Sequence, residues 1–513
     1  MIPSVYDILA DRATITPHSP ALTAGTITVP YAALREEADR FAGWLRSAGV
    51  ERGDRVAVYL EKTPAMVASL FGAAAADAVF VPINPVLKPR QVAHILADSG
   101  ATTLVTSVDR WRSLVGSGLP MGDLARVVFA DEGGDASGLQ TVSWSQLPAA
   151  GPQRPFAAET DLAAILYTSG STGSPKGVAL SHRNLVAGAE SVNAYLGNTS
   201  EDVLLAVLPL SFDAGLSQLT TGFLAGAHVV LLNYLLPRDV VRACERHRVT
   251  GITGVPPLWG QLATLDWRDA GASVRYFANT GGRMPLPTLT RMREHLPHAS
   301  PFLMYGLTEA FRSTYLDPSQ VDVRPDSIGR AIPNAEVLVL RPDGTECAPG
   351  EPGELVHRGP LVALGYWRDP VRTAERFRPD PFVSPDDTGW RTPSRAVWSG
   401  DTAIRDAEGF LYFVGRSDEM IKKSGYRISP AEIEEAFLRA GASEAVALGR
   451  PEELVGHRIV VVLGGVADTD EVVASVRREL PAYMLPDETI VLDSLPRNAN
   501  GKFDRTALEE TYG

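Results

Sequence analysis

Residues 162–178 read LAAILYTSGSTGSPKGV, an apolar run followed by a stretch rich in glycine and hydroxyl side chains that contains Lys176. The apolar run has the length and composition of a strand buried on both faces. Glycines let backbone N–H groups approach an anion closely, hydroxyl groups donate further hydrogen bonds, and the lysine supplies a positive charge. The pattern therefore predicts a strand that ends in a phosphate-binding loop. A flexible surface loop is the alternative, since runs of Gly and Ser are often only that.

The loop differs from the common P-loop at one decisive position. In the pattern G-x-x-x-x-G-K-[ST], the hydroxyl residue after the lysine binds magnesium. Here Gly177 follows Lys176. The loop is therefore expected to hold phosphate by a different arrangement.

The chain around this loop alternates between helical and strand patterns. Apolar residues recur at helical spacing over 28–50 and again over 91–100, and each of these segments leads into a short apolar run, at 55–60 and 101–107. Such alternation predicts an α/β fold with layered sheets. From about 325 to 416 the pattern changes to short strands separated by turns, which predicts a β-rich subdomain.

The predicted organisation is a large multi-layer N-terminal α/β domain, a joint, and a small C-terminal domain. We assign residues 1–416 to the N-terminal core, 417–418 to a hinge, and 419–513 to a small, mobile α/β lid. The chain has 513 residues, which is more than one hydrophobic core normally spans.

Composition excludes several classes of protein. There are 48 basic and 61 acidic residues, giving a formal charge of −13, with no basic block, so a nucleic-acid binder is not expected. Cys244 and Cys347 are too few and too far apart for a disulfide framework, which fits the cytoplasm. No signal peptide is evident. The most apolar segment, 66–83, contains Asp77 and is typical of a buried helix leading into a strand rather than a membrane span.

Several further stretches accompany the loop, in a fixed order. They are YGLTEA at 305–310, GELVHRGPLVALGYW at 353–367, WSGDTA at 398–403, FVGRSDEMIKKSGYRISPAEIE at 413–434 and LPRNANGKFDR at 495–505. Together with the loop, they resemble the adenylate-forming superfamily of acyl-CoA synthetases, amino-acid adenylation domains and luciferases. The resemblance covers essentially the whole chain. It is nearest in appearance to stand-alone AMP-forming acyl or aminoacyl ligases of bacterial biosynthetic clusters.

The resemblance implies an enzyme that uses ATP and Mg²⁺ to convert a carboxylic acid into an acyl-adenylate. Tyr305 would pack on adenine, with Gly306 beside it, Thr308 would bond the α-phosphate, and Glu309 would hold the magnesium ion. Asp401 would accept the ribose hydroxyls with help from Arg416. The remaining nucleotide-binding residues implied are Thr168, Ser169, Gly170, Ser171, Thr172, Gly173, Lys176 and Gly282.

The resemblance also gives the C-terminal segment two tasks. Lys502, which follows a turn at Asn500 and Gly501, would be the catalytic lysine of adenylation. A rotation about Asp418 would then present another face of the small domain for transfer to a thiol. Gly425 would line the path of the pantetheine arm, where any side chain would obstruct it. One site would thereby carry out two reactions.

The acid is expected to bind beside the stretch VLPLSFDAGLSQLTTGFLAGA at 207–227. Phe212 stands where many fatty and aryl acyl-CoA synthetases have His. Asp213 resembles the aspartate of amino-acid adenylation domains that pairs with the substrate ammonium. A carboxylate in an apolar stretch is costly unless it is paired, which favours that role. An N-cap or backbone-satisfying role at the start of the next helix is the alternative.

Two further stretches, 253–262 and 277–285, are expected to complete the substrate pocket. Trp259 would form a wall, and Arg283 would either read a second carboxylate or face solvent. The other residues assigned to the pocket are Val255, Pro256 and Gly281.

Three functions remain open on the sequence. The first is a ligase that loads an amino acid or a similar acid onto a free-standing acyl or peptidyl carrier protein. The second is an acyl-CoA synthetase for a fatty or aryl acid, for which the lysines at 422–423 would offer the CoA 3′-phosphate a basic site. The third, a binding protein that has lost the chemistry, is disfavoured because Lys176, Glu309, Asp401 and Lys502 are all present.

Overall fold

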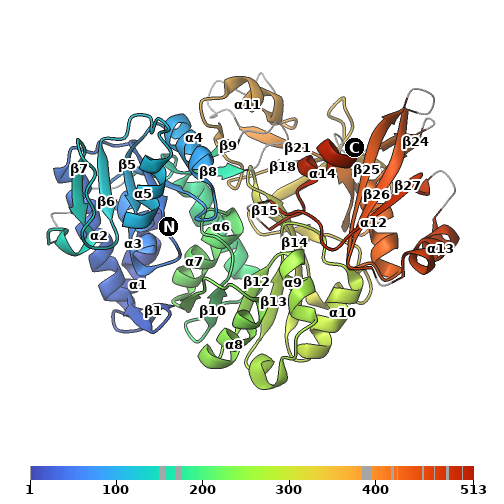
Figure 1. Cartoon of the computed structure of the whole chain (residues 1–513), viewed down its shortest axis with the longest axis horizontal. Helices are drawn as coiled ribbons and strands as arrows, with labels where there is room; N and C mark the ends of the chain where they lie inside the picture. The colour runs from blue at the N-terminus through green and yellow to red at the C-terminus, as the bar shows by residue number, and fades with distance from the viewer. Residues whose placement is uncertain are drawn as a thin grey trace.

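The computed structural model describes residues 2–149, 157–168, 175–383, 394–416, 421–423, 426–452, 456–466, 468–480, 484–498 and 501–513. Two large sheets and the helices around them make up most of the chain, as Figure 1 shows. The C-terminal segment, drawn in orange and red, lies at the far end of the molecule from strands β5–β7 (Figure 1). The mixed α/β class predicted from the sequence is confirmed.

The larger sheet contains nine described strands, and its central strands run parallel. Parallel strands covered on both faces are typically continuous apolar runs, which explains the apolar sequences at 203–206 and 228–231. In spatial order the strands are β16 (Arg330–Ala331), β15 (Phe311–Leu316), β14 (Ser300–Leu307), β13 (Tyr276–Asn279), β12 (Gly251–Gly254), β10 (Val203–Ala206), β11 (His228–Leu231), β1 (Pro20–Ala24) and β2 (Ile27–Pro30).

The second sheet has eight described strands, and the two that flank the phosphate-loop motif pair antiparallel near one edge. In spatial order they are β19 (Gly365–Tyr366), β9 (Lys176–Ser181), β8 (Leu162–Thr168), β4 (Val79–Pro82), β3 (Arg55–Tyr59), β5 (Ala101–Thr106), β6 (Arg126–Phe129) and β7 (Gln140–Ser143).

A layer of helices lies between the two sheets and forms the main core with both of them. Phe41, Phe71 and Phe223 of this layer pack in one buried cluster with Val56 of β3 and Val229 of β11. The helices of this layer are α1 (Val5–Ile15), α2 (Tyr31–Ser47), α3 (Pro64–Ala75), α6 (His182–Leu196) and α7 (Asp213–Ala225).

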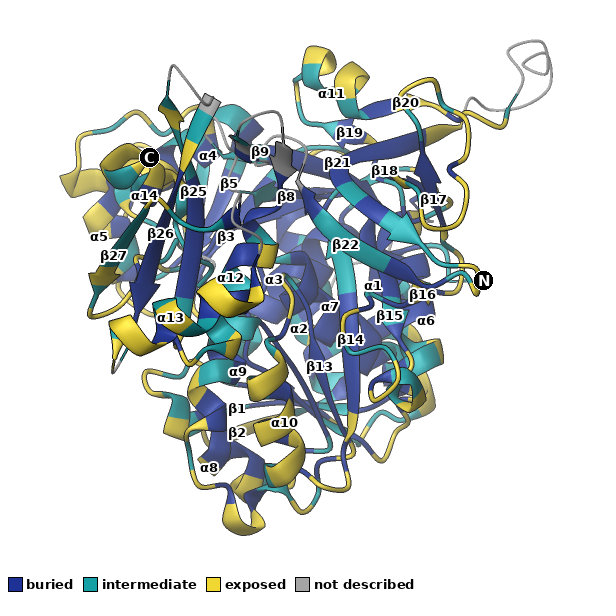
Figure 2. Ribbon diagram, turned by 90° about the vertical axis from the view of Figure 1, so that its right-hand side faces the viewer, coloured by how far each residue is buried: buried dark blue, intermediate teal, exposed yellow. Residues whose placement is uncertain are grey.

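The outer faces of the sheets are covered by further helices, whose exposed sides appear yellow at α8 and α10 in Figure 2. Residues of α4 (Pro89–Ser99) and α5 (Val108–Gly116) share a buried cluster with the eight-stranded sheet. Residues of α8 (Pro237–His247), α9 (Pro256–Ala263) and α10 (Leu286–His295) pack against the nine-stranded sheet.

The β-rich subdomain predicted near 325–416 is present as an antiparallel sheet. Its strands are β17 (Glu336–Leu340), β18 (Pro352–Arg358), β21 (Arg395–Arg405) and β20 (Phe377–Pro379), with β22 (Leu411–Arg416) paired to β21. The short helix α11 (Pro370–Arg376) lies beside β19 and β20.

The C-terminal segment forms its own small α/β unit. The charged start of this unit, for which the sequence predicted no strand, contains an antiparallel pair of β23 (Ile421–Lys423) and β24 (Tyr426–Ile428). The remaining elements are α12 (Pro430–Arg439), β25 (Glu444–Glu452), β26 (Gly456–Gly464), α13 (Thr469–Glu479), β27 (Glu488–Leu492) and α14 (Arg505–Tyr512). The hinge assigned to 417–418 lies outside the described residues.

The apolar segment 66–83 is a buried helix, α3, followed by buried β4, as predicted. Among the described parts of the chain, every helix is too short or too polar to cross a membrane.

Candidate active site

Two antiparallel strands flank the phosphate-loop motif. Strands β8 and β9 pair antiparallel, with Thr168 opposite Lys176, so a second strand follows the loop rather than the helix of a P-loop. The Lys176 ammonium lies 5.7 Å from the centroid of the Tyr366 ring. Burial, and then the nearby Arg372, lower the pKa of Lys176. Five of the implied phosphate ligands, Ser169, Gly170, Ser171, Thr172 and Gly173, lie outside the described residues.

The YGLTE motif crosses the end of β14 and turns into the cleft beside β8 and β9. The Tyr305 hydroxyl donates to Asp401 Oδ2 at 2.5 Å, which joins this motif to β21. The Tyr366 hydroxyl donates to Glu309 Oε1 at 2.7 Å. A Cβ added at Gly306 would lie 2.3 Å from the carbonyl oxygen of Phe311, so this position has no room for a side chain. The nucleotide motifs from three sheets therefore meet at one place.

Arg416 is placed opposite Asp401 by strand register. The two residues are Cα partners in the β21–β22 pair. The side chain of Arg416 lies outside the described part of the structure, so its help to Asp401 stays a prediction. Asp418 and Gly425 also lie outside the described residues.

Lys502 extends from the C-terminal unit to the N-terminal sheets. Its ammonium nitrogen lies 5.8 Å from the centroid of the Phe212 ring. A Cβ added at Gly281 would lie 3.3 Å from Lys502 Cε. The turn that carries Lys502 is closed by a backbone hydrogen bond from Asn498 to Lys502 of 2.8 Å, and Gly501 within it has φ +77°. The lysine thus enters the cleft next to the predicted acyl site.

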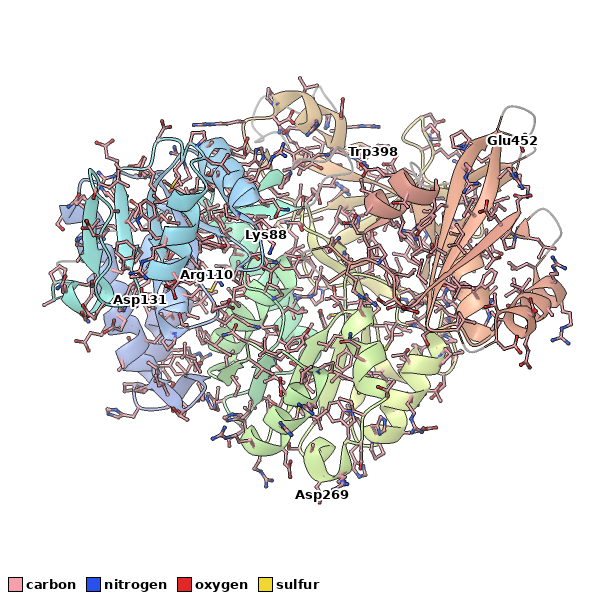
Figure 3. All side chains as sticks on the ribbon, viewed as in Figure 1. Lys88, Arg110, Asp131, Asp269, Trp398 and Glu452 are labelled. Atoms are coloured by element: carbon pink, nitrogen blue, oxygen red, sulfur yellow. The ribbon has the colours of Figure 1, made fainter. Side chains whose placement is uncertain are left out.

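These residues line a single cleft of about 2730 Å³. Trp398 of β21, labelled in Figure 3, also belongs to its wall. The predicted site residues that line it are Thr168, Lys176, Phe212, Asp213, Pro256, Gly281, Gly282, Arg283, Tyr305, Gly306, Thr308, Glu309, Asp401 and Lys502.

Asp213 is a buried carboxylate at the cleft wall. Only 7 % of the residue is exposed. Phe212 occupies the N-cap position of α7 and Asp213 is its first residue, so Asp213 is not the N-cap. It does accept a hydrogen bond from the Ala214 N–H, which fits the backbone-satisfying form of the alternative role. Burial raises the pKa of Asp213, while the nearby charges of Arg312 and Lys502 and the Ala214 N–H oppose that shift. A cationic partner would therefore stabilise the charged form of this carboxylate.

The structure places three of the predicted substrate-pocket residues differently from the prediction. Trp259 is fully buried, packs on Phe277 with ring centroids 5.5 Å apart, and does not line the cleft, so it is part of the core rather than a pocket wall. Arg283 is neither a free reader of a carboxylate nor turned only to solvent, because it pairs with Asp326 and with Glu435 of α12. Val255 does not line the cleft itself, although its side chain lies under Gly281.

Comparison with known proteins agrees with this geometry. The family model described as AMP-binding enzyme matches residues 9–367, and the model of the AMP-binding enzyme C-terminal domain matches residues 432–502. The chain belongs to the AMP-binding enzyme family.

Relatives of this AMP-binding enzyme include both CoA ligases and peptide synthetases. It is 33 % identical to feruloyl-CoA synthase of an Amycolatopsis species, covering 98 % of each chain. It is 30 % identical to bacitracin synthase 3 of Bacillus licheniformis over 99 % of its own length, but it spans only 8 % of that much longer protein. The solved structure of o-succinylbenzoate CoA synthetase from Bacillus subtilis in complex with ATP and magnesium is 28 % identical and covers 98 % of both chains, with a TM-score of 0.81. The family match and these relatives together support an ATP-dependent, AMP-forming acid ligase.

The described residues fit ATP and magnesium. The cleft of about 2730 Å³ brings a lysine, a hydroxyl group and two carboxylates together, from Lys176, Thr308, Glu309 and Asp401. Among the described residues no group of three or more His, Cys, Asp and Glu side chains is arranged as a metal cage. Mg²⁺ does not need one, because it is commonly held by one or two carboxylates together with substrate phosphates. Glu309 is the carboxylate available for that role.

Sequence reasoning missed two buried basic side chains near the acyl site. The Lys62 ammonium donates to the carbonyl oxygens of Ala206 and Val207 at 2.9 and 2.8 Å, which fixes the chain just before Phe212. Arg312 of β15 is 1 % exposed and donates to Ser217 of α7. Both follow a motif or an apolar run in the sequence, but nothing local indicates which way their side chains point.

Proposed function

We propose that this AMP-binding enzyme activates an amine-bearing carboxylic acid, an amino acid or a close analogue, and transfers it to the pantetheine thiol of a separate carrier protein. The observation that carries the first half of this proposal is Asp213, a buried carboxylate in the cleft wall beside Lys502. A buried carboxylate is stabilised by a partner with opposite charge and full hydrogen bonding. A substrate ammonium would supply both.

The activation step requires two anions, the carboxylate and the triphosphate, to come together. Magnesium supplies charge neutralisation when it is bound, and Glu309 is the residue that would hold it. Lys176 would neutralise the β- and γ-phosphates from the start of β9, while Lys502 would stabilise charge that builds up where the carboxylate oxygen attacks the α-phosphate. Thr308 would donate to the same phosphate. Attack expels pyrophosphate and leaves the acyl group joined to AMP.

Residues of β14 and β21 would hold the nucleoside end of ATP. Tyr305 would pack against adenine, and its hydroxyl already orients Asp401 by a direct hydrogen bond. Asp401 would then accept from the ribose hydroxyls, with Arg416 beside it in register. Holding AMP at this end positions the α-phosphate near Lys502, which gives the rate advantage of fixed geometry.

Transfer to the thiol requires Lys502 to leave. The inter-domain contact between Arg283 and Glu435 belongs to the arrangement with Lys502 in the cleft. Rotation at 417–418 would break it and bring Gly425 towards the acyl-adenylate. The thiol would lose its proton to water, and its sulfur would form a bond to the acyl carbon. The bond between that carbon and the phosphate oxygen would break, and AMP would leave with its electron pair. Domain alternation of this kind lets one site perform both steps.

A second candidate is an acyl-CoA synthetase. The similarity to feruloyl-CoA synthase over 98 % of both chains favours it. The basic pair at 422–423 gives it less support than the sequence suggested, because the Lys423 ammonium is 2.7 Å from Asp487. Lys423 would have to exchange this partner before it could meet a CoA 3′-phosphate.

The choice of acceptor is tested by intact-mass measurement. The enzyme, ATP, magnesium and an accepted acid are incubated either with pantetheine-loaded acyl and peptidyl carrier proteins or with CoA. We expect a carrier protein to gain the mass of the acyl group at a higher rate than CoA thioester appears. Rapid formation of the CoA thioester with no loading of any carrier would contradict the carrier assignment. It would leave the activation step intact.

A further inference from the structure

Arg312 is a buried guanidinium behind the acyl site. Its Nη1 donates to Ser217 Oγ at 2.6 Å and its Nη2 to the carbonyl oxygen of Ala214 at 3.1 Å, both on α7. Its Nε is buried and has no hydrogen-bond partner among the described residues. Phe311 packs against the guanidinium at 5.2 Å from its ring centroid. The side chain is therefore held firmly with at least one strong donor unused.

A small cavity of about 10 Å³ adjoins this guanidinium. Its polar lining includes Ser217, Gln218 and Asn198, and two of their atoms, Gln218 Oε1 and Asn198 Nδ2, are buried without a hydrogen-bond partner in the described structure. Met304 is the lining residue that the cavity and the cleft share, and an unbranched side chain of this kind can change its conformation readily.

The charge of Arg312 is incompletely compensated. Its hydrogen-bond partners among the described residues, Ser217 and Ala214, are uncharged, and its charge acts on Asp213 only through space. An unpaired charge or polar group in a protein interior costs stability, so such groups occur where a partner is expected. An oxygen on the bound acid would provide that partner. The cavity volume is about that of one water-sized probe, so only a terminal oxygen of such a group would enter it.

We propose that Arg312 determines substrate specificity by donating hydrogen bonds to an oxygen at the far end of the acid. The acid is therefore short and carries a second carboxylate, a carboxamide or a hydroxyl group, and a second carboxylate pairs best. This inference rests on the proposed activation of an acid in the cleft. Arg312, rather than Arg283, would then bind the second carboxylate of the acid. With an amine at Asp213 and a carboxylate at Arg312, an acidic amino acid satisfies both buried charges.

The test uses pairs of acids with the same shape that differ only in oxygen. Aspartate and asparagine are compared with leucine, threonine with valine, and succinate with 4-methylpentanoate, in ATP–pyrophosphate exchange. For the wild type we expect kcat/KM to favour the oxygen-bearing member by about 100-fold, since a site built for hydrogen bonds rejects an analogue that lacks them. Arg312→Met should remove or invert this ratio, and Arg312→Lys should keep part of it.

The controls separate specificity from folding and from the proposed function. Arg341→Met, in a surface ion pair with Glu351, should leave the ratios unchanged. Stabilisation by ATP in thermal melting reports whether each variant is folded, and the wild-type ratios test the idea even if the Met variant does not fold. Equal rates within each pair, or a Met variant that lowers both members alike, would overturn the inference; the cavity then holds only a water and Arg312 only supports α7. The succinate pair tests Arg312 even if acids without an amine are preferred.

Discussion

The ammonium of Lys502 stands 5.8 Å from the ring centroid of Phe212, the residue that precedes Asp213. The last motif of the chain thus meets the start of α7, across 290 residues of sequence, and contributes to the electrostatic environment of Asp213. The described arrangement therefore corresponds to the proposed activation step, with the lysine beside the acid.

Replacing Lys502 by Ala should abolish formation of the acyl-adenylate but spare the second step. Loss of one donor aimed at developing charge costs roughly 100- to 1000-fold in rate. Pyrophosphate exchange should fall by that factor, while thioester formation from preformed acyl-adenylate should persist. Exchange at the wild-type rate would refute the role of Lys502.

Asp213→Asn should have opposite effects on stability and on substrate recognition. Burial raises the pKa of Asp213 above its ordinary value of 3.8, so the folded protein binds this proton more tightly than the unfolded chain. The free energy of unfolding of the empty enzyme should therefore fall as pH rises from about 4 through the raised pKa, and the Asn variant should lack this decline. Urea unfolding at a series of pH values measures it.

Ionisation of Asp213 should increase the activity of the enzyme towards amine-bearing acids. Because an ammonium pairs with the carboxylate form, kcat/KM for such acids should rise with pH over that window, and Asp213→Asn should lower it by roughly 30-fold or more, the equivalent of about 2 kcal/mol. Acids without an amine should lose much less. An equal loss for both classes would assign Asp213 a structural role at the start of α7.

Arg283→Ala should weaken adenylation slightly without affecting thiol transfer. The Arg283 and Glu435 side chains are 37 % and 23 % exposed, so solvent screens the pair and its contribution is about 1 kcal/mol or less. We expect a drop of roughly five-fold or less in exchange, with a weaker dependence on salt. Arg293→Ala, whose partner Asp322 lies within the N-terminal domain, is the matched control and should change neither step. A larger effect on transfer than on exchange would contradict this account.

Gly306→Ala should destabilise the protein, whereas Gly260→Ala should not. A Cβ at Gly306 meets the Phe311 carbonyl oxygen at 2.3 Å, a backbone atom that cannot rotate away, so the free energy of unfolding should fall by about 1–3 kcal/mol. Gly260 lies in α9 with nothing within 4 Å of an added Cβ, and Ala there should add roughly 0.5–1 kcal/mol. Chemical denaturation compares the two. Equal free energies of unfolding for the two variants would contradict this expectation, because β14 would then have to shift to make room for the added Cβ.

Much of the fold was readable from the sequence because its strands are continuous apolar runs. The run at 162–168 became β8, and the turn-rich stretch after 325 became the separate antiparallel sheet. The strand pair β23 and β24 was missed because its charged residues hide the strand pattern.

The site was readable where a motif carries its own geometry, and not elsewhere. The motifs predicted that Lys176, Thr308, Asp401 and Lys502 would meet, and all four line the cleft. Trp259 was misplaced because helical spacing does not distinguish a core face from a cleft face. The pairing of Arg283 with Glu435 joins residues 152 positions apart, which no local pattern reveals.

The most direct test of the central claim is pyrophosphate exchange with matched acids that differ only in the amine. Aspartate is compared with succinate, and leucine with 4-methylpentanoate, with ATP and magnesium in excess. We predict exchange that depends on the amine in each pair and is lost in Asp213→Asn. Exchange supported only by the acids that lack an amine would contradict recognition at Asp213 and would favour an acyl-CoA synthetase instead.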